Sequence, residues 1–170
     1  MRVRQYLWLA IPFLLSLTAC HNLNDDRIPR MPVNIDLSNA GVWNAYGVQG
    51  YGLFNYFILN SGTVLPPGFP YSYNSSTGYG GVLLIGGQNP YTGEVGPLAY
   101  DLSCPVERSP TVRVGVDPNT YDAICPECGS HYNVVEANGA PVEGIAVELG
   151  YALTPYRCYA TVEGGYVIRD

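Results

Sequence analysis

Two cysteines in one short stretch are the first residues of this chain that could do chemistry. The stretch Ile124–Asn133 reads ICPECGSHYN and contains Cys125 and Cys128. Its proline, glycine and serine favour a tight turn, so both sulfurs should lie in one loop. Two thiols in one loop can ligate a metal ion, ligate an iron–sulfur cluster or form a disulfide bond.

The other cysteines decide which of these sites is complete. The chain has 5 cysteines, and the last four have the spacing C-x20-C-x2-C-x29-C, formed by Cys104, Cys125, Cys128 and Cys158. A zinc site made of two C-x2-C pairs would need a second such pair, which the sequence lacks. Three thiolates could hold zinc if Cys104 joins the loop, with Cys158, His131 or Glu107 as the fourth donor.

Covalent closure is an open alternative, because thiols of exported proteins tend to oxidise and four cysteines permit two bridges. Cys104 would then bridge to Cys125 or Cys128. A lone strand cysteine such as Cys158 is typical of small core filling. In thiol–disulfide oxidoreductases the C-x2-C pair lies at the N-terminus of a helix. The residues after Cys128 predict a turn and a strand instead, so the sequence does not favour oxidoreductase chemistry.

The N-terminus predicts export. It has a basic start, an apolar run over residues 6–17 and the ending Leu17-Thr18-Ala19-Cys20. This ending resembles the lipobox of bacterial lipoproteins, which implies a signal peptide over residues 1–19 and a lipidated Cys20. The three acyl chains of such a lipoprotein anchor it durably, because one chain alone is marginal.

Residues 20–32 predict a tether, because they are polar, contain prolines and lack an apolar period. The residue after the acylated cysteine sorts many bacterial lipoproteins, and aspartate there retains them in the inner membrane. His21 is not aspartate. We therefore expect a lipid-anchored protein of the bacterial cell envelope, in the outer membrane.

Composition limits the function classes. The net charge is −6, with 8 Lys+Arg against 14 Asp+Glu. Proteins that bind nucleic acids need clustered basic residues to contact the phosphate backbone, so we expect no nucleic-acid partner. No nucleophile elbow, P-loop or paired-carboxylate pattern appears in the sequence. The expected role is therefore structural or interactive, and no catalytic residue is predicted.

The elements that must position the thiols are short strands. The 15 Tyr, 20 Gly and 14 Pro favour strands and turns, and segments such as Val33–Leu37 and Val112–Val116 alternate apolar with polar residues. Outside the leader no helical period is evident. We predict an all-β domain over residues 33–170, with a Tyr/Gly-rich insertion around residues 41–80 that buries aromatic rings over the sheet.

The order of these motifs resembles the Rieske-type iron–sulfur family, specifically over residues 100–168. The stretches LAYDLSCPV and CPECGSHY are similar to the two cluster-binding loops of that family. The resemblance implies stacked antiparallel sheets with two adjacent cysteine-bearing loops. It puts Cys104 and Cys125 at the cysteine ligands, but Val106 and Cys128 at the histidine ligands.

This departure changes the expected chemistry. A Rieske cluster needs two imidazoles on one iron, and Val106 offers no lone pair. The family's loop-bridging disulfide is also missing, because its positions hold Ser109 and Glu127. We expect a degenerate Rieske-like domain whose loops are closed by disulfide or zinc, contributing to the envelope through an unidentified protein partner. The alternative is an electron carrier with an unusually ligated 2Fe-2S cluster.

Overall fold

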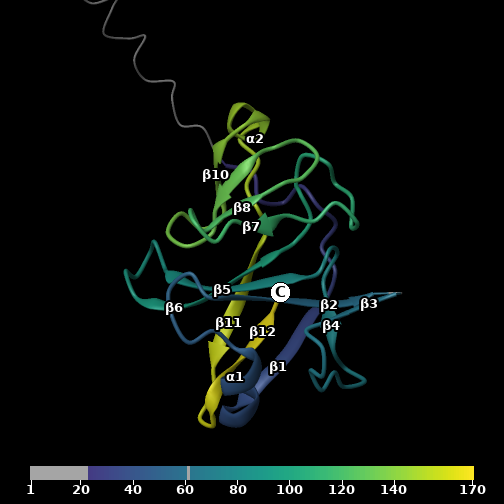
Figure 1. The fold of residues 1–170 in the computed structure, drawn as a ribbon, viewed down its shortest axis with the longest axis vertical. Coiled ribbons are helices and arrows are strands. Elements are labelled where there is room, and N and C mark those ends of the chain that lie inside the picture. Colours follow the sequence, from purple (N-terminus) through teal and green to yellow (C-terminus); the bar gives the residue numbers. More distant parts are fainter. Residues whose placement is uncertain (1–22, 61) are drawn as a thin grey trace, which may run out of the picture.

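The structure is a computed structural model that describes residues 23–60 and 62–170. Within these residues the chain forms two antiparallel sheets and two short helices, which confirms the all-β prediction (Figure 1). The larger sheet has eight strands in the order β3-β2-β5-β6-β11-β12-β1-β4 and curls into a half-barrel. The smaller sheet has four strands in the order β10-β9-β8-β7.

The larger sheet contains β1 (Val33–Asn39), β2 (Phe54–Asn60), β3 (Thr63–Leu65), β4 (Ser76–Thr77), β5 (Val82–Gln88), β6 (Val95–Asp101), β11 (Pro155–Ala160) and β12 (Gly164–Arg169). The smaller sheet contains β7 (Gly115–Val116), β8 (Asp122–Ile124), β9 (His131–Asn133) and β10 (Ala140–Glu143). The helices are α1 (Ala40–Tyr46) and α2 (Ile145–Leu149). Both are too short to give a helical period in the sequence, which is why none was predicted.

Strand β5 separates two hydrophobic cores. Its side chains alternate between the two faces of the sheet, so Leu83 and Ile85 enter one core while Val82 and Leu84 enter the other. We call the first the thiol core, because it also holds Cys104 and Cys125. The second is the aromatic core, which includes Trp43, Phe57 and Phe69. All four β5 side chains are fully buried, as their uninterrupted apolar run requires.

Residues 41–80, predicted as an insertion, contribute to the sheet itself. Strand β2 pairs with β5 over four residues, and α1 packs against β1 and β12. Several aromatic side chains of this region nevertheless pack in the core as expected, since the Phe69 ring contacts the rings of Phe57, Tyr46 and Tyr71 at centroid distances of 5.1, 5.3 and 4.7 Å.

The structure differs from the predicted tether over residues 24–28, which we call the N-terminal strap. Asn24 forms a parallel bridge with Tyr151, its N–H donating to Gly150 and its carbonyl accepting from Ala152. Ile28 is buried. The polar composition of the strap hid this contact from the sequence, because most of its bonds are made by the backbone and Ile28 is its one buried apolar side chain.

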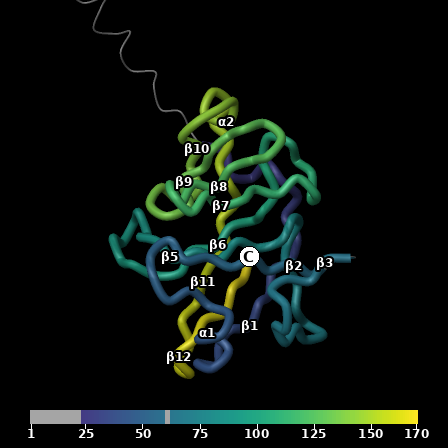
Figure 2. Tube along the Cα trace, viewed as in Figure 1, coloured from purple at the N-terminus to yellow at the C-terminus, as the bar shows by residue number. Residues whose placement is uncertain are grey.

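The two ends of the molecule carry different elements. The smaller sheet and α2 lie at one end, and α1 with the β11–β12 turn lies at the other (Figure 1). The chain that follows α2 runs the length of the molecule to that turn (Figure 2). Among the described residues, no helix is long and apolar enough to cross a membrane.

Candidate metal centre

The three candidate ligands come from two loops that follow strands. Cys104 lies just beyond the end of β6, where the isolated bridge between Ser103 and Arg113 holds the chain against the approach to β7. Cys125 follows β8 directly, and its loop ends where β9 begins at His131. Because β8 and β9 pair as a hairpin, both ends of this loop are fixed by the smaller sheet.

Both loops contain the same turn. In each, a Cys-Pro pair is followed by a chain reversal in which the fourth residue after the cysteine donates its N–H to the cysteine carbonyl. The bond from Arg108 to Cys104 is 2.9 Å, and the bond from Gly129 to Cys125 is 3.0 Å. Arg108 and Gly129 have φ of 54° and 66°, the left-handed conformation that closes such a turn.

This equivalence of the two turns relates individual side chains. Cys104 corresponds to Cys125, and Glu107 corresponds to Cys128, since each pair stands at the same distance before the left-handed residue. The first loop therefore has an exposed carboxylate where the second has a thiol.

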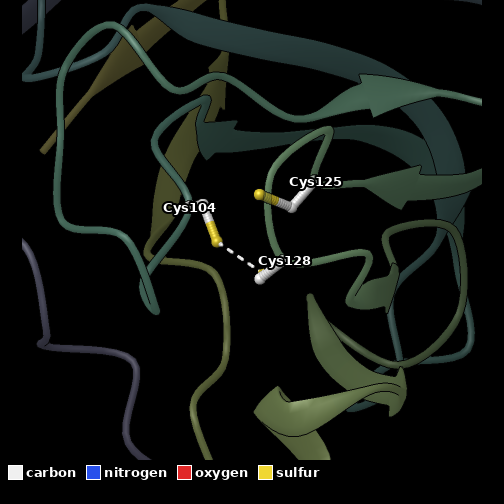
Figure 3. A group of neighbouring side chains, drawn as sticks. All are labelled: Cys104, Cys125 and Cys128. Atoms are coloured by element: carbon white, nitrogen blue, oxygen red, sulfur yellow. Dashed lines mark hydrogen bonds between the residues drawn. The ribbon is translucent and has the colours of Figure 1, made fainter.

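The sulfurs of Cys104, Cys125 and Cys128 converge between the loops (Figure 3). All three lie within 4.8 Å of one another, and the Sγ atoms of Cys104 and Cys128 are 3.7 Å apart. Cys104 and Cys125 are buried, whereas Cys128 is half-buried. The four cysteines of the described residues are free thiols. Three cysteines this close can hold a metal ion.

Two hydroxyl groups contact the sulfurs. The Tyr132 hydroxyl, in the buried core, lies 3.5 Å from Sγ of Cys104, and Ser130 Oγ lies 3.3 Å from Sγ of Cys128. Helix α2 holds Ser130 in this position, because the N–H of Ala146, the second residue of the helix, donates to Ser130 Oγ at 3.2 Å. The Ser130 hydroxyl hydrogen thus remains available to a Cys128 thiolate.

The two thiols of the second loop differ in acidity. Burial raises the pKa of Cys125 to about 12, although the backbone N–H groups of Cys128 and Glu127 favour its thiolate. Partial burial also acts against ionisation of Cys128, but hydrogen bonds from Ser130 and the neighbouring thiols outweigh it, so the pKa of Cys128 lies below its usual value. Of these two thiols, Cys128 is therefore the one that ionises first.

Two of the predicted fourth donors, His131 and Cys158, lie elsewhere, and Glu107 is not part of the group of converging ligand atoms. Among the described residues, only Cys104, Cys125 and Cys128 form a group of this kind. His131 points toward the smaller sheet's carboxylates, with Nδ1 3.8 Å from Glu143 and 4.0 Å from Asp122. Cys158 pairs with Ile168 across β11 and β12, on the side of the aromatic core, and burial raises its pKa to about 12. Val106 packs against the thiol core, as an apolar side chain without a lone pair should.

The sequence reasoning did not assign roles to Ser130 and Tyr132. Their spacing in the sequence could have indicated these roles, because Ser130 and Tyr132 follow Cys128 by two and four residues. Residues two apart in an extended chain point to the same side. Cys20, the predicted lipidation site, lies outside the described residues.

Comparisons of the chain with protein-family models, with curated proteins and with solved structures find no match.

Proposed function

We propose that this chain is a lipid-anchored protein of the bacterial cell envelope whose domain serves a structural or interaction role. In this proposal, zinc bound by Cys104, Cys125 and Cys128 clamps the two loops together. The observation that carries the proposal is the convergence of three sulfurs within 4.8 Å.

The sulfur separations favour a single tetrahedral ion. Zinc with Zn–S bonds of about 2.3 Å holds neighbouring sulfurs about 3.8 Å apart. The Cys104 and Cys128 sulfurs are 3.7 Å apart, so they need little movement to bind. A two-iron cluster would distribute its ligands over two metal ions and so spread some sulfurs farther apart. Three sulfurs within 4.8 Å of one another therefore support one ion.

The donor set also fits zinc. When bound, the ion would replace the thiol protons and draw the three thiolates into one coordination sphere. The backbone N–H groups around Cys125 and the Ser130 hydroxyl beside Cys128 would stabilise the thiolate charge. Glu107 occupies the position in the first loop that corresponds to Cys128 in the second, so its carboxylate is our candidate for the fourth donor.

The same arrangement supports a degenerate Rieske-like plan without Rieske chemistry. Two antiparallel sheets carrying two adjacent cysteine loops agree with the plan that the sequence resembles. The imidazole pair that sets the potential of a Rieske centre has no counterpart, because its positions hold Val106 and Cys128. We therefore assign the loops a clamping role and leave electron transfer by a 2Fe-2S cluster as the alternative.

Metal analysis of the purified full chain tests the clamp. We expect about one zinc per chain, lost in Cys104→Ser and retained in Cys158→Ser, since Cys158 lies on the other core. Each variant removes one thiol, so a difference in zinc content between them reports the position of the thiol and not the number of thiols. Iron and acid-labile sulfide in protein prepared without oxygen would instead favour the electron carrier, and metal-free protein with paired thiols would favour a disulfide.

The anchor has its own test. Cys20→Ala should abolish labelling with a radioactive fatty acid and release the chain from the membrane fraction, because acylation requires that cysteine. A chain that stays membrane-bound without any lipid label would refute lipid anchoring. Separation of inner and outer membranes by density would then check the expected outer-membrane location.

A further inference from the structure

Helix α2 exposes apolar side chains at one end of the molecule. Its sequence is IAVEL, and of these five residues only Ala146 is buried. The exposed aliphatic side chains of this end are Leu23 (52%), Val142 (49%), Ile145 (40%), Val147 (41%) and Leu149 (43%). Single exposed aliphatic residues are common on protein surfaces, but a group of them marks a contact with another apolar phase.

The described chain begins beside this helix. Asn24 donates its N–H to the carbonyl of Gly150, the residue that ends α2, in a bond of 2.7 Å. Leu23 therefore lies next to the last turn of α2. Ile145 and Leu149 are four residues apart and so lie on one side of the helix. Together with Leu23 they form one apolar surface. We call Leu23, Val142, Ile145, Val147 and Leu149 the apolar cap.

The strap fixes the distance between this cap and the predicted lipid. Asn24 is four residues after Cys20, and four residues of fully extended chain span at most about 14 Å. Further bonds hold the strap in place, since the Thr154 hydroxyl donates to the Asp25 carbonyl and Arg108 Nε donates to the Arg27 carbonyl at 3.1 Å. An acylated Cys20 would thus keep Asn24, and the cap beside it, within about 14 Å of the lipid.

We infer that the apolar cap lies in the headgroup region of the bilayer that holds the lipid anchor. The inference rests on the proposed lipidation of Cys20. Side chains of an interfacial helix enter the boundary between headgroups and acyl chains by about 5 to 10 Å, which suits the short α2 better than a spanning role. Glu143 and Glu148 are exposed within the same surface, so the cap fits zwitterionic lipids rather than anionic ones.

This orientation places the thiol site close to the membrane side of the domain. Ser130 touches Cys128 and also accepts the N–H of Ala146 in α2, while Arg108 of the first loop holds the strap. Both cysteine loops therefore support the elements that present the cap. The far end of the molecule, with the β11–β12 turn, would point away from the bilayer (Figure 1).

Tryptophan fluorescence in vesicles tests the inference. The full chain, made with its lipid and extracted in detergent, is reconstituted into phosphatidylcholine vesicles that carry bromine on their acyl chains. Ile145→Trp probes the cap, and Val162→Trp is the control, because Val162 is fully exposed in the β11–β12 turn. Of the two native tryptophans, Trp8 lies in the predicted signal peptide, which is removed when Cys20 is acylated, and Trp43 is buried and contributes equally to both variants. Leu149→Trp is the second probe if Ile145→Trp fails to fold.

We expect vesicle flotation for both variants, with bromine quenching the new tryptophan at position 145 and not at position 162. Flotation without quenching at position 145 would overturn the docked cap and leave lipid anchoring intact. Loss of flotation and of lipid labelling would refute the anchor and the inference together. Unquenched emission at position 145 that is shielded from aqueous iodide, in a chain that cross-links to itself, would assign the cap to a second copy.

Discussion

At the residue scale, Asp101 organises the approach to the first cysteine loop. Its carboxylate is fully buried and accepts N–H bonds from Tyr79 (2.9 Å), Gly80 (3.1 Å) and Ser103 (2.7 Å), and an O–H bond from Tyr156 (2.6 Å). A buried carboxylate is stable only when such donors surround it. Burial and the Asp101 carboxylate together raise the pKa of Tyr156, which therefore stays a neutral donor. Asp101 thus fixes the chain three residues before Cys104.

Replacing Asp101 should measure this contribution. Asp101→Asn puts an NH₂ group against at least one backbone donor, so we expect the free energy of unfolding to fall by about 2 to 4 kcal/mol. Tyr156→Phe removes a single donor and should cost less. Asp26→Asn is the control, because its carboxylate is exposed and pairs only with Arg30, and it should leave the urea midpoint unchanged. An Asp101→Asn midpoint equal to that of the parent would contradict this account.

Glu107 tests the equivalence of the two cysteine turns. Glu107→Ala should weaken zinc binding about tenfold or more, because it removes the candidate fourth donor. Glu127→Ala is matched to it, as an exposed glutamate in the other loop at a position that corresponds to Val106. Competition with a chromophoric chelator gives both affinities, and the visible spectrum of the cobalt-substituted chain reports the change in donor set. Equal affinities for the two variants would mean that water or another group completes the site.

At the element scale, α2 links the smaller sheet to the thiol loop through close packing. Gly144 precedes the helix with φ of 83°, a conformation that glycine adopts without strain. A Cβ at this position would stand 2.8 Å from Cα of Ser130 and 2.9 Å from its Oγ. The backbone of α2 therefore approaches the second cysteine loop at a distance that only glycine permits.

Gly144→Ala should accordingly affect both stability and metal binding. The left-handed backbone and the clash with Ser130 together should lower the free energy of unfolding by about 2 kcal/mol. Zinc affinity should fall as well, because Ser130 would shift away from Cys128. Gly115→Ala, in β7 of the smaller sheet, is the control, since a Cβ there meets nothing within 4 Å. Denaturant unfolding with and without zinc checks the prediction, which fails if the two variants behave alike.

At the scale of the whole molecule, the N-terminal strap joins parts that are distant in sequence. It contacts residues just after α2 through Asn24 and Asp25, the first cysteine loop through Arg27, and the interior through Ile28. The Arg27 guanidinium also stacks over the Tyr151 ring at 4.2 Å from its centroid. The domain that folds is therefore larger than the segment from Val33 onward.

Ile28→Ala should destabilise the domain by about 3 kcal/mol, because the Ile28 side chain is buried, with only 5% of its surface exposed. Leu23→Ala is the control, since Leu23 is half-exposed and should leave thermal unfolding in detergent unchanged. A domain that begins at Met31 should show the loss of Ile28 and of the strap's hydrogen bonds together. Equal melting temperatures for domains that begin at Leu23 and at Met31 would show that the strap does not stabilise the fold.

The local features of this protein follow from the types and order of neighbouring residues. Period-2 alternation located β1, and glycines and prolines marked the turns, because these signals depend on neighbouring residues only. The Cys-Pro turns and the C-x2-C loop followed from the same local chemistry. The sequence also limited the site to a few sulfur donors.

Which donors meet depends on contacts between residues that are distant in the sequence. Cys158 and His131 were reasonable fourth ligands by composition, but strand register turns Cys158 toward the aromatic core and His131 toward Glu143. Register is set by how the whole chain buries its apolar faces, and a shift of one residue would reverse both side chains. The strap was likewise hidden, because backbone bonds such as that from Asn24 to Gly150 leave no pattern of residue types in the sequence.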